Sequence, residues 1–223
     1  MTNKTEFEKY ATMHMGIPTT TVESVTKSFI PTSMTPHIME ERQMNIAQMS
    51  VFDRLMMDRI IFLGTGINSE IANIVQAQLL FLQSTHSDTD ITMYVNSPGG
   101  GVYAGLGIIA TMDLVSPDIR TINTGMCASM GAVILAAGTK GKRSALKYSR
   151  TMIHQIMGGA NGGTQYSDMQ IIAKEMGELE KDLFYILSNG SNLTYDEVKE
   201  KSNRDYWMRP EEALELGFID SIL

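Results

Sequence analysis

The chain has 223 residues, of which 43% are hydrophobic, and it carries a formal net charge of -7 at pH 7. This length suits one domain with a continuous core, and the acidic balance argues against a nucleic-acid partner, because such proteins display basic clusters. A single cysteine excludes a disulfide within the chain and is typical of a reducing compartment. The longest clean apolar run, residues 130–137, is far shorter than the about 20 residues that a membrane span needs. No secretion signal is recognisable, so we expect a cytoplasmic protein without membrane contact.

The first residues differ in composition from the rest of the chain. Residues 1–33 are rich in Thr, Ser and Pro and have no helical or strand period. They predict a flexible tail or a removable propeptide, followed by one domain over residues 34–223. Residues 34–50 are polar and show no core face, so regular structure is expected only after them.

The body of the chain alternates strand-like and helix-like segments. The strands are expected at 59–63, 90–96 and 119–124, and the helices from Asn68 or Ser69 to Leu82 and from Val102 to Leu114. Such alternation predicts right-handed crossovers and a mainly parallel sheet of α/β class.

The second half continues with shorter elements. A buried helix is expected at 132–137, a strand at 151–153, a long helix at 166–188, a strand near 206–208 and a helix opened by Pro210. The basic residues 140–143 predict a solvated loop, and the Gly-rich residues 158–163 a flexible one.

Ser129 is the candidate nucleophile. It lies in a turn of small residues, 125–131, between the strand at 119–124 and the buried helix. A serine hydroxyl is a weak nucleophile at neutral pH, so this hypothesis requires a histidine base, an orienting acid and an oxyanion site.

His154 is the best placed of the four histidines to act as the base. It ends an apolar strand just before the Gly-rich loop. By contrast, His14 lies in the tail, His37 in the polar segment and His86 in a loop. The glycines at 99–101 can bring backbone N–H groups close to a reacting oxygen, and the N–H of Met130 is the natural second donor.

Other chemistries fit the sequence less well. The glycines near Gly105 fall inside an expected helix, unlike a dinucleotide fingerprint, and residues 138–143 lack the Ser or Thr of a phosphate loop. No histidines or cysteines have metal-ligand spacing, so we expect no metal and no cofactor. Cys127 is expected to be a packed thiol, and its presence two residues before Ser129 breaks the usual nucleophile-elbow motif of α/β-hydrolases.

Several motifs occur together in a familiar order. They are residues 94–100 (Tyr-Val-Asn-Ser-Pro-Gly-Gly), 125–131 (Gly-Met-Cys-Ala-Ser-Met-Gly), 136–143 (Ala-Ala-Gly-Thr-Lys-Gly-Lys-Arg) and 152–155 (Met-Ile-His-Gln). From about Met34 to Leu223 the chain resembles the ClpP family, the proteolytic subunits of ATP-dependent Clp proteases.

The resemblance implies a role for each matching residue. Ser129 matches the family nucleophile, His154 the general base and Asp205 the acid that orients the histidine. Gly100 and Met130 match the two oxyanion-hole amides. The implied fold is crotonase-like, with stacked ββα units and a protruding strand-helix handle that begins at the Gly-rich loop.

The family also implies an assembly and partners. Its members are serine endopeptidases that form two stacked heptameric rings and hydrolyse unfolded polypeptides inside the chamber, in protein quality control. The polypeptides are delivered by an AAA+ ATPase unfoldase of the Clp type, which fits the lack of a phosphate loop in this chain.

The chain departs from the family at Cys127, Gly101 and Asn203, and its loop after His154 is longer. The departures leave the triad intact but suggest a looser oxyanion loop and altered ring pairing. Two other functions stay open at this point: a non-catalytic ring subunit of the same assembly, and a crotonase-like acyl-CoA enzyme.

Overall fold

The computed structural model describes residues 37–42, 45–159 and 162–223. The chain divides into two units, Met1–Arg54 and Leu55–Leu223. The domain boundary expected near residue 33 and the predicted tail before it lie outside the described residues.

The first unit contains a hairpin that the sequence did not predict. Strand β1 (His37–Arg42) pairs antiparallel with β2 (Asn45–Ser50), with His37 opposite Ser50 and Arg42 opposite Asn45. The expectation of no regular structure before residue 51 was therefore wrong. The ladder is made by backbone groups, which pair without the alternation of apolar side chains that we required of a strand.

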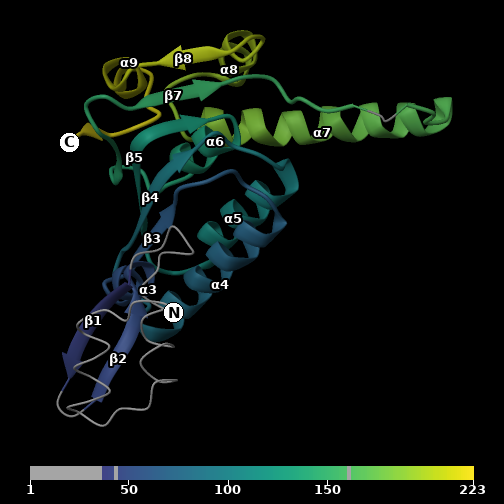
Figure 1. The fold of residues 1–223 in the computed structure, drawn as a ribbon. Coiled ribbons are helices and arrows are strands. Elements are labelled where there is room, and N and C mark those ends of the chain that lie inside the picture. The colour runs from purple at the N-terminus through teal and green to yellow at the C-terminus, as the bar shows by residue number, and fades with distance from the viewer. Residues whose placement is uncertain (1–36, 43–44, 160–161) are drawn as a thin grey trace, which may run out of the picture. The chain divides into compact units, whose positions relative to one another are not determined.

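The second unit is a sheet with covering helices (Figure 1). Its strands are β3 (Ile60–Leu63), β4 (Ile91–Ser97), β5 (Ile119–Ala128), β6 (Arg143–Ala145), β7 (Arg150–Ile153), β8 (Tyr206–Met208) and β9 (Ser221–Ile222). The helices are α4 (Ser69–Thr85), α5 (Val102–Leu114), α6 (Met130–Ala136), α7 (Tyr166–Asn189), α8 (Tyr195–Lys201) and α9 (Pro210–Glu215), and α3 (Val51–Met57) lies at the boundary of the two units.

The sheet is mostly parallel, as predicted. Its order is β3-β4-β5-β6-β9, and each of these neighbours pairs in parallel. Strand β5 is long enough to pair twice, because Thr121–Asn123 contact β6 and Met126–Ala128 contact β7. Strand β8 then adds antiparallel to β7 and ends this branch of the sheet.

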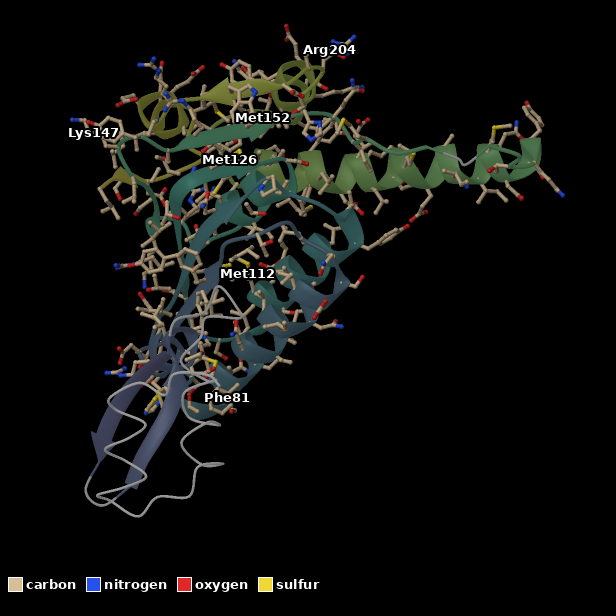
Figure 2. All side chains as sticks on the ribbon, viewed as in Figure 1. Phe81, Met112, Met126, Lys147, Met152 and Arg204 are labelled. Carbon is tan, nitrogen blue, oxygen red and sulfur yellow. The ribbon has the colours of Figure 1, made fainter. Side chains whose placement is uncertain are left out.

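The crossover helices follow the capping and periodicity of the sequence. The side chain of Asn68 accepts a hydrogen bond from the N–H of Ile71 and so caps α4, whose buried residues Ala72, Val75, Leu79 and Leu82 form one face. Helix α5 has the predicted bounds. Met112 of α5 and Met152 of β7 are buried, whereas Phe81 of α4 is half exposed; all three are labelled in Figure 2.

Helix α6 is the centre of the core, since each of its residues is buried. Helix α7 differs along its length. Its buried residues, Leu179, Leu183, Phe184 and Leu187, all lie in its second half, and its first half extends beyond the sheet (Figure 1).

This helix is the predicted handle. The segment before it, residues 154–159, runs beside α7 but forms no strand. A strand is defined by its ladder, and within the described part of the chain this segment has no neighbouring strand with which to pair.

Candidate active site

Ser129 occupies a one-residue turn between β5 and α6. Its φ of 55° and ψ of -125° lie outside the usual regions for a residue with a side chain. The turn is shorter than predicted, because pairing of Met126–Ala128 with β7 extends the strand to the residue before Ser129. The N–H of Ser129 donates to the carbonyl oxygen of Met152 at 2.8 Å, and its carbonyl oxygen accepts from Ala132 at 2.9 Å. The strained backbone is therefore held from both sides, as expected where a strand presents a nucleophile.

A glycine turn packs directly against this serine. Gly99 has φ +91°, and a Cβ there would lie 2.7 Å from the carbonyl oxygen of Ala128 and 2.8 Å from Cβ of Ser129. Gly100 has φ +152°, and a Cβ there would lie 2.1 Å from the carbonyl oxygen of Ile67. Only glycine permits this approach of two backbones.

Two backbone N–H groups border the serine. Ile67 donates to Gly99 and accepts from Gly101, both at 2.8 Å, which leaves the N–H of Gly100 outside this pairing. Met130 is the first residue of α6, and an N–H at that position has no acceptor within its own helix. Both residues line the cavity that contains Ser129. They are positioned to hold a negative oxygen.

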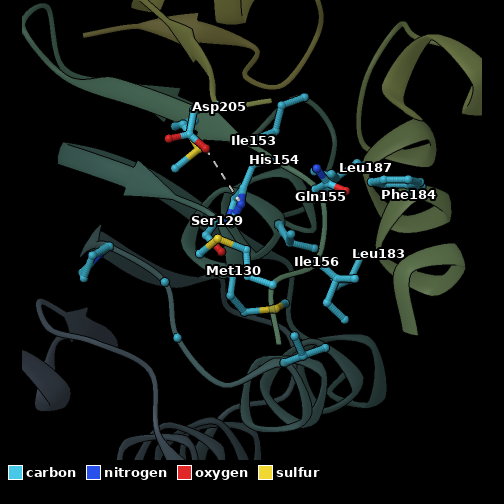
Figure 3. Close-up of a pocket in the computed structure, with 17 residues that line it drawn as sticks. Ser129, Met130, Ile153, His154, Gln155, Ile156, Leu183, Phe184, Leu187 and Asp205 are labelled. Carbon is cyan, nitrogen blue, oxygen red and sulfur yellow. Dashed lines mark ion pairs between the residues drawn. The ribbon is translucent and has the colours of Figure 1, made fainter. Parts of the chain in front are cut away.

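His154 and Asp205 come together through the register of β7 and β8. Thr151 pairs with Met208, Met152 with Trp207 and Ile153 with Tyr206, so the next positions along the ladder are His154 and Asp205. Nδ1 of His154 lies 4.0 Å from Oδ1 of Asp205, the contact drawn as a dashed line in Figure 3. This separation is longer than a hydrogen bond. The two side chains differ in exposure, at 8% for His154 and 63% for Asp205.

One cavity joins these groups. It has a volume of about 450 Å³ and is lined by Ser129, His154, Asp205 and the glycine turn. Its remaining wall is mainly apolar and includes Met130, Val133, Ile153, Ile156, Leu183, Phe184 and Leu187 (Figure 3). Ser129 therefore lies beside a space that suits an apolar side chain.

Gly105 has a packing role that sequence reasoning missed. A Cβ at Gly105 would lie 2.2 Å from Cγ of Met130, so this glycine lets α5 lie close to α6 behind the serine turn. A glycine in the middle of a helix is the signal that could have indicated it. Gln155 is a second missed contact, because its Nε2 donates to the carbonyl oxygen of Asn203 at 2.9 Å, close to both His154 and Asp205.

Among the described residues, the other candidates Cys127 and His86 do not line this cavity. Cys127 is fully buried, as expected, and burial raises the pKa of its thiol well above the ordinary value. His86 caps the end of α4, and His14 lies outside the described residues. Over the described ranges no group of three or more His, Cys, Asp or Glu side chains could hold a metal ion, and no helix there is long and apolar enough to cross a bilayer.

The structure of the basic residues 140–143 agrees only partly with the predicted solvated loop. Lys142 is paired with Asp90 and Asp118, and Arg143 belongs to β6 and is 3% exposed. The guanidinium of Arg143 forms an ion pair with Asp220 and donates to the carbonyl oxygens of Ala136 and Gly190. The prediction of a solvated loop was wrong for Arg143, because its partner Asp220 is distant in the sequence and gave no local signal.

The parallel sheet, its covering helices and the serine turn define a mixed α/β protein with a serine-centred site. The model of the Clp protease family matches residues 42–223. The ATP-dependent Clp protease proteolytic subunit of Bacteroides fragilis is 54% identical over 98% of both chains, and that of Porphyromonas gingivalis is 53% identical over 98% of this chain and 97% of its own. Subunit 1 of the same protease from Prochlorococcus marinus is 50% identical over 85% of this chain and 96% of its own.

The chain belongs to the Clp protease family. This confirms the family, the fold class and the serine peptidase class that were predicted from the sequence.

Proposed function

We propose that Ser129, His154 and Asp205 are the catalytic triad of a serine endopeptidase and that the N–H groups of Gly100 and Met130 form its oxyanion hole. The observation that carries this proposal is the meeting of all five residues in one cavity, around a serine held in a strained turn. A serine, a histidine base, an orienting acid and an oxyanion hole are sufficient to cleave a peptide bond, so the site needs no further reactive group.

In the proposed mechanism each group has its own task. Nδ1 of His154 faces Asp205, so Nε2 is the atom that takes the proton of the Ser129 hydroxyl. Ser129 Oγ attacks the substrate carbonyl, whose oxygen becomes negative and accepts from the N–H groups of Gly100 and Met130. His154 then gives its proton to the leaving amine, and water hydrolyses the acyl-enzyme by the same steps. Asp205 stabilises the imidazolium throughout.

The shape of the cavity supports a peptide substrate. An extended chain that places its carbonyl at Ser129 can place an apolar side chain against Met130, Val133 and Leu183. The apolar wall also lowers the local polarity, which strengthens the oxyanion contacts.

The relatives support the rest of the proposal. They are named as proteolytic subunits of an ATP-dependent protease, so we infer an AAA+ ATPase unfoldase of the Clp type as partner and unfolded polypeptides as substrates. We further infer an assembly of two stacked heptameric rings that encloses the sites, in the cytoplasm. In such an assembly, access to the chamber limits which proteins are cut.

The decisive experiment replaces the nucleophile. Ser129→Ala should abolish hydrolysis of a fluorogenic peptide and labelling by a fluorophosphonate, whereas Ser87→Ala, at an exposed turn, should leave both unchanged. Turnover that persists in Ser129→Ala would overturn the proposal. A wild-type protein that is folded but neither hydrolyses nor labels would favour a non-catalytic ring subunit, and binding of a coenzyme A derivative would favour an acyl-CoA enzyme.

A further inference from the structure

The carboxylate of Asp205 is weakly held by its own contacts. It is 63% exposed, and within the described residues its one ion pair is the 4.0 Å contact with His154. Its position therefore depends on the backbone that carries it, and Asp205 is the residue directly before β8. That strand has three residues and pairs only with β7.

The next residue, Tyr206, fixes the same end of β8. Side chains alternate along a strand, so Tyr206 lies on the opposite face from Asp205, where it packs against the core together with Met208. Its phenol donates a hydrogen bond to Oε1 of Glu212 in α9 and accepts one from Nζ of Lys201 in α8 at 3.1 Å. The Lys201 ammonium also lies 4.4 Å from the centre of the Tyr206 ring.

Both partners, Lys201 and Glu212, belong to helices that are anchored in the core. Helix α8 is anchored by Val198 and α9 by Ala213, which are completely buried. Hydrogen bonds to charged groups are stronger than neutral ones, and here they are partly buried. The hydrogen bond with Tyr206 raises the pKa of Lys201 despite partial burial, so the ammonium stays charged across the neutral range. One phenol thus joins α8, β8 and α9 next to the proposed triad acid.

We propose that Tyr206 is a positioning residue, whose bonds to Lys201 and Glu212 set the distance between Asp205 and His154. The inference rests on the proposed function of those two residues. Closing the 4.0 Å contact to a hydrogen bond requires a shift of about 1 Å, and errors of that size in a catalytic geometry can cost up to about 100-fold in rate. Loss of the Tyr206 hydroxyl leaves the ladder between β7 and β8 intact. We therefore expect a fall in rate smaller than 100-fold.

The first test is Tyr206→Phe, which removes only the hydroxyl. We expect kcat for a fluorogenic peptide to fall about three- to tenfold, with KM within about twofold, because Tyr206 does not line the cavity. Tyr148→Phe is the matched control, since Tyr148 is 83% exposed, and it should keep the wild-type kcat. Glu212→Gln, which retains an acceptor for the Tyr206 hydroxyl, should stay close to wild type. Glu212→Ala should show only part of the effect of Tyr206→Phe, because the hydrogen bond from Lys201 to the hydroxyl remains.

The second test separates positioning from general stability. In an Asp205→Asn background, Tyr206→Phe should cause no further loss in the rate of fluorophosphonate labelling at Ser129, because the group through which it acts is already disabled. An equal loss in both backgrounds would overturn the proposal, as would a wild-type kcat in Tyr206→Phe. Either result leaves the triad itself intact, whereas failure of the triad would appear as activity in Ser129→Ala.

Discussion

Backbone strain at Ser129 is the feature on which the site depends most. The positive φ of this residue costs of order 1–3 kcal/mol, and the hydrogen bonds of its amide groups to Met152 and Ala132 hold it in place. Gly99 and Gly100 bring a second backbone against it. The proposed oxyanion hole is therefore built from main-chain N–H groups alone. The glycines matter because they have no side chain that would keep the two backbones apart.

Substitutions in the glycine turn test this view. Gly100→Ala should lower kcat by about 100-fold, because a Cβ 2.1 Å from the carbonyl oxygen of Ile67 must displace the N–H donor. Gly101→Ser should keep kcat within about twofold, since Gly101 has an ordinary φ of -61° and its Cβ would meet nothing nearer than 3.6 Å. Peptide hydrolysis, with a melting curve to confirm folding, measures both. A large loss in Gly101→Ser would show that the loop needs glycine at this position too.

Cys127 should be chemically silent in the folded protein. Its thiol is buried beside the carbonyl oxygen of Val95, and burial raises its pKa, so little thiolate forms and reagents have no access. We expect no reaction with a thiol-specific reagent at pH 8 until denaturant is added, and near-normal activity in Cys127→Ala. Rapid modification of the native protein, followed with loss of activity, would contradict this structure of the serine turn.

At the scale of elements, Arg143 ties together the ends of two helices. Ala136 is the last residue of α6 and Gly190 is the C-cap of α7, and both give their carbonyl oxygens to the guanidinium. A positive charge is favourable at helix C-termini. Because α6 begins next to Ser129 and α7 lines the cavity, this distant contact fixes two walls of the site.

Asp220 neutralises this arginine and makes stability depend on pH. Partial burial raises the pKa of Asp220, but hydrogen bonds from the Arg143 side chain and backbone, together with its charge, outweigh burial and lower the pKa overall. A lowered pKa in the folded state means that the stabilisation is present above about pH 4, the ordinary range for Asp, and is lost as the pH falls toward the folded-state value.

Asp220→Asn should reduce the free energy of unfolding by about 2–3 kcal/mol at pH 7. This is less than the about 3–5 kcal/mol of a fully buried pair, because the Asp220 side chain remains 22% exposed. The difference from wild type should shrink near pH 3, as wild-type Asp220 becomes protonated. Urea titrations at both pH values measure it. Glu178→Gln, which breaks the exposed pair with Lys181, is the control and should change little.

At the scale of the molecule, the projecting half of α7 leaves an apolar surface exposed. Several large apolar or aromatic side chains in its projecting half are exposed, including Tyr166, Met169 and Ile171. In the proposed double ring this helix and the segment beside it would meet the opposite ring. The segment at 154–159 would then gain the strand partner that it lacks within the described chain.

The first residues of the chain provide a test of activity in the assembly. The relative from Prochlorococcus marinus aligns over 190 residues, or 85% of this chain, and the family match begins at residue 42. We expect the tail before about residue 33 to be removed by the protein itself. Intact mass should show a shortened wild-type chain and a full-length Ser129→Ala chain, purified in parallel. Equal masses would mean that the tail is not processed by this site.

The sequence by itself determined most of the longer elements and most of the candidate site. Local signals, such as the Asn68 cap and the apolar run after Ser129, correctly placed α4, α5, α6 and the long helix α7. They also selected Ser129, His154 and the glycine turn, because each is marked by its immediate neighbours. The hairpin β1-β2 and the short elements α3, β6, α8 and β9 were missed, since polar or very short segments carry no clear period.

Only the tertiary structure decided which distant residues meet. Asp205 and Arg143 have no local mark that separates them from other charged residues, and the match of Asp205 came from resemblance. The antiparallel register of β7 and β8 sets Asp205 opposite His154, and β6 carries Arg143 to Asp220. Register is a property of two strands together, fixed by ladder hydrogen bonds and by the core on which both pack, so neither strand's own sequence contains it.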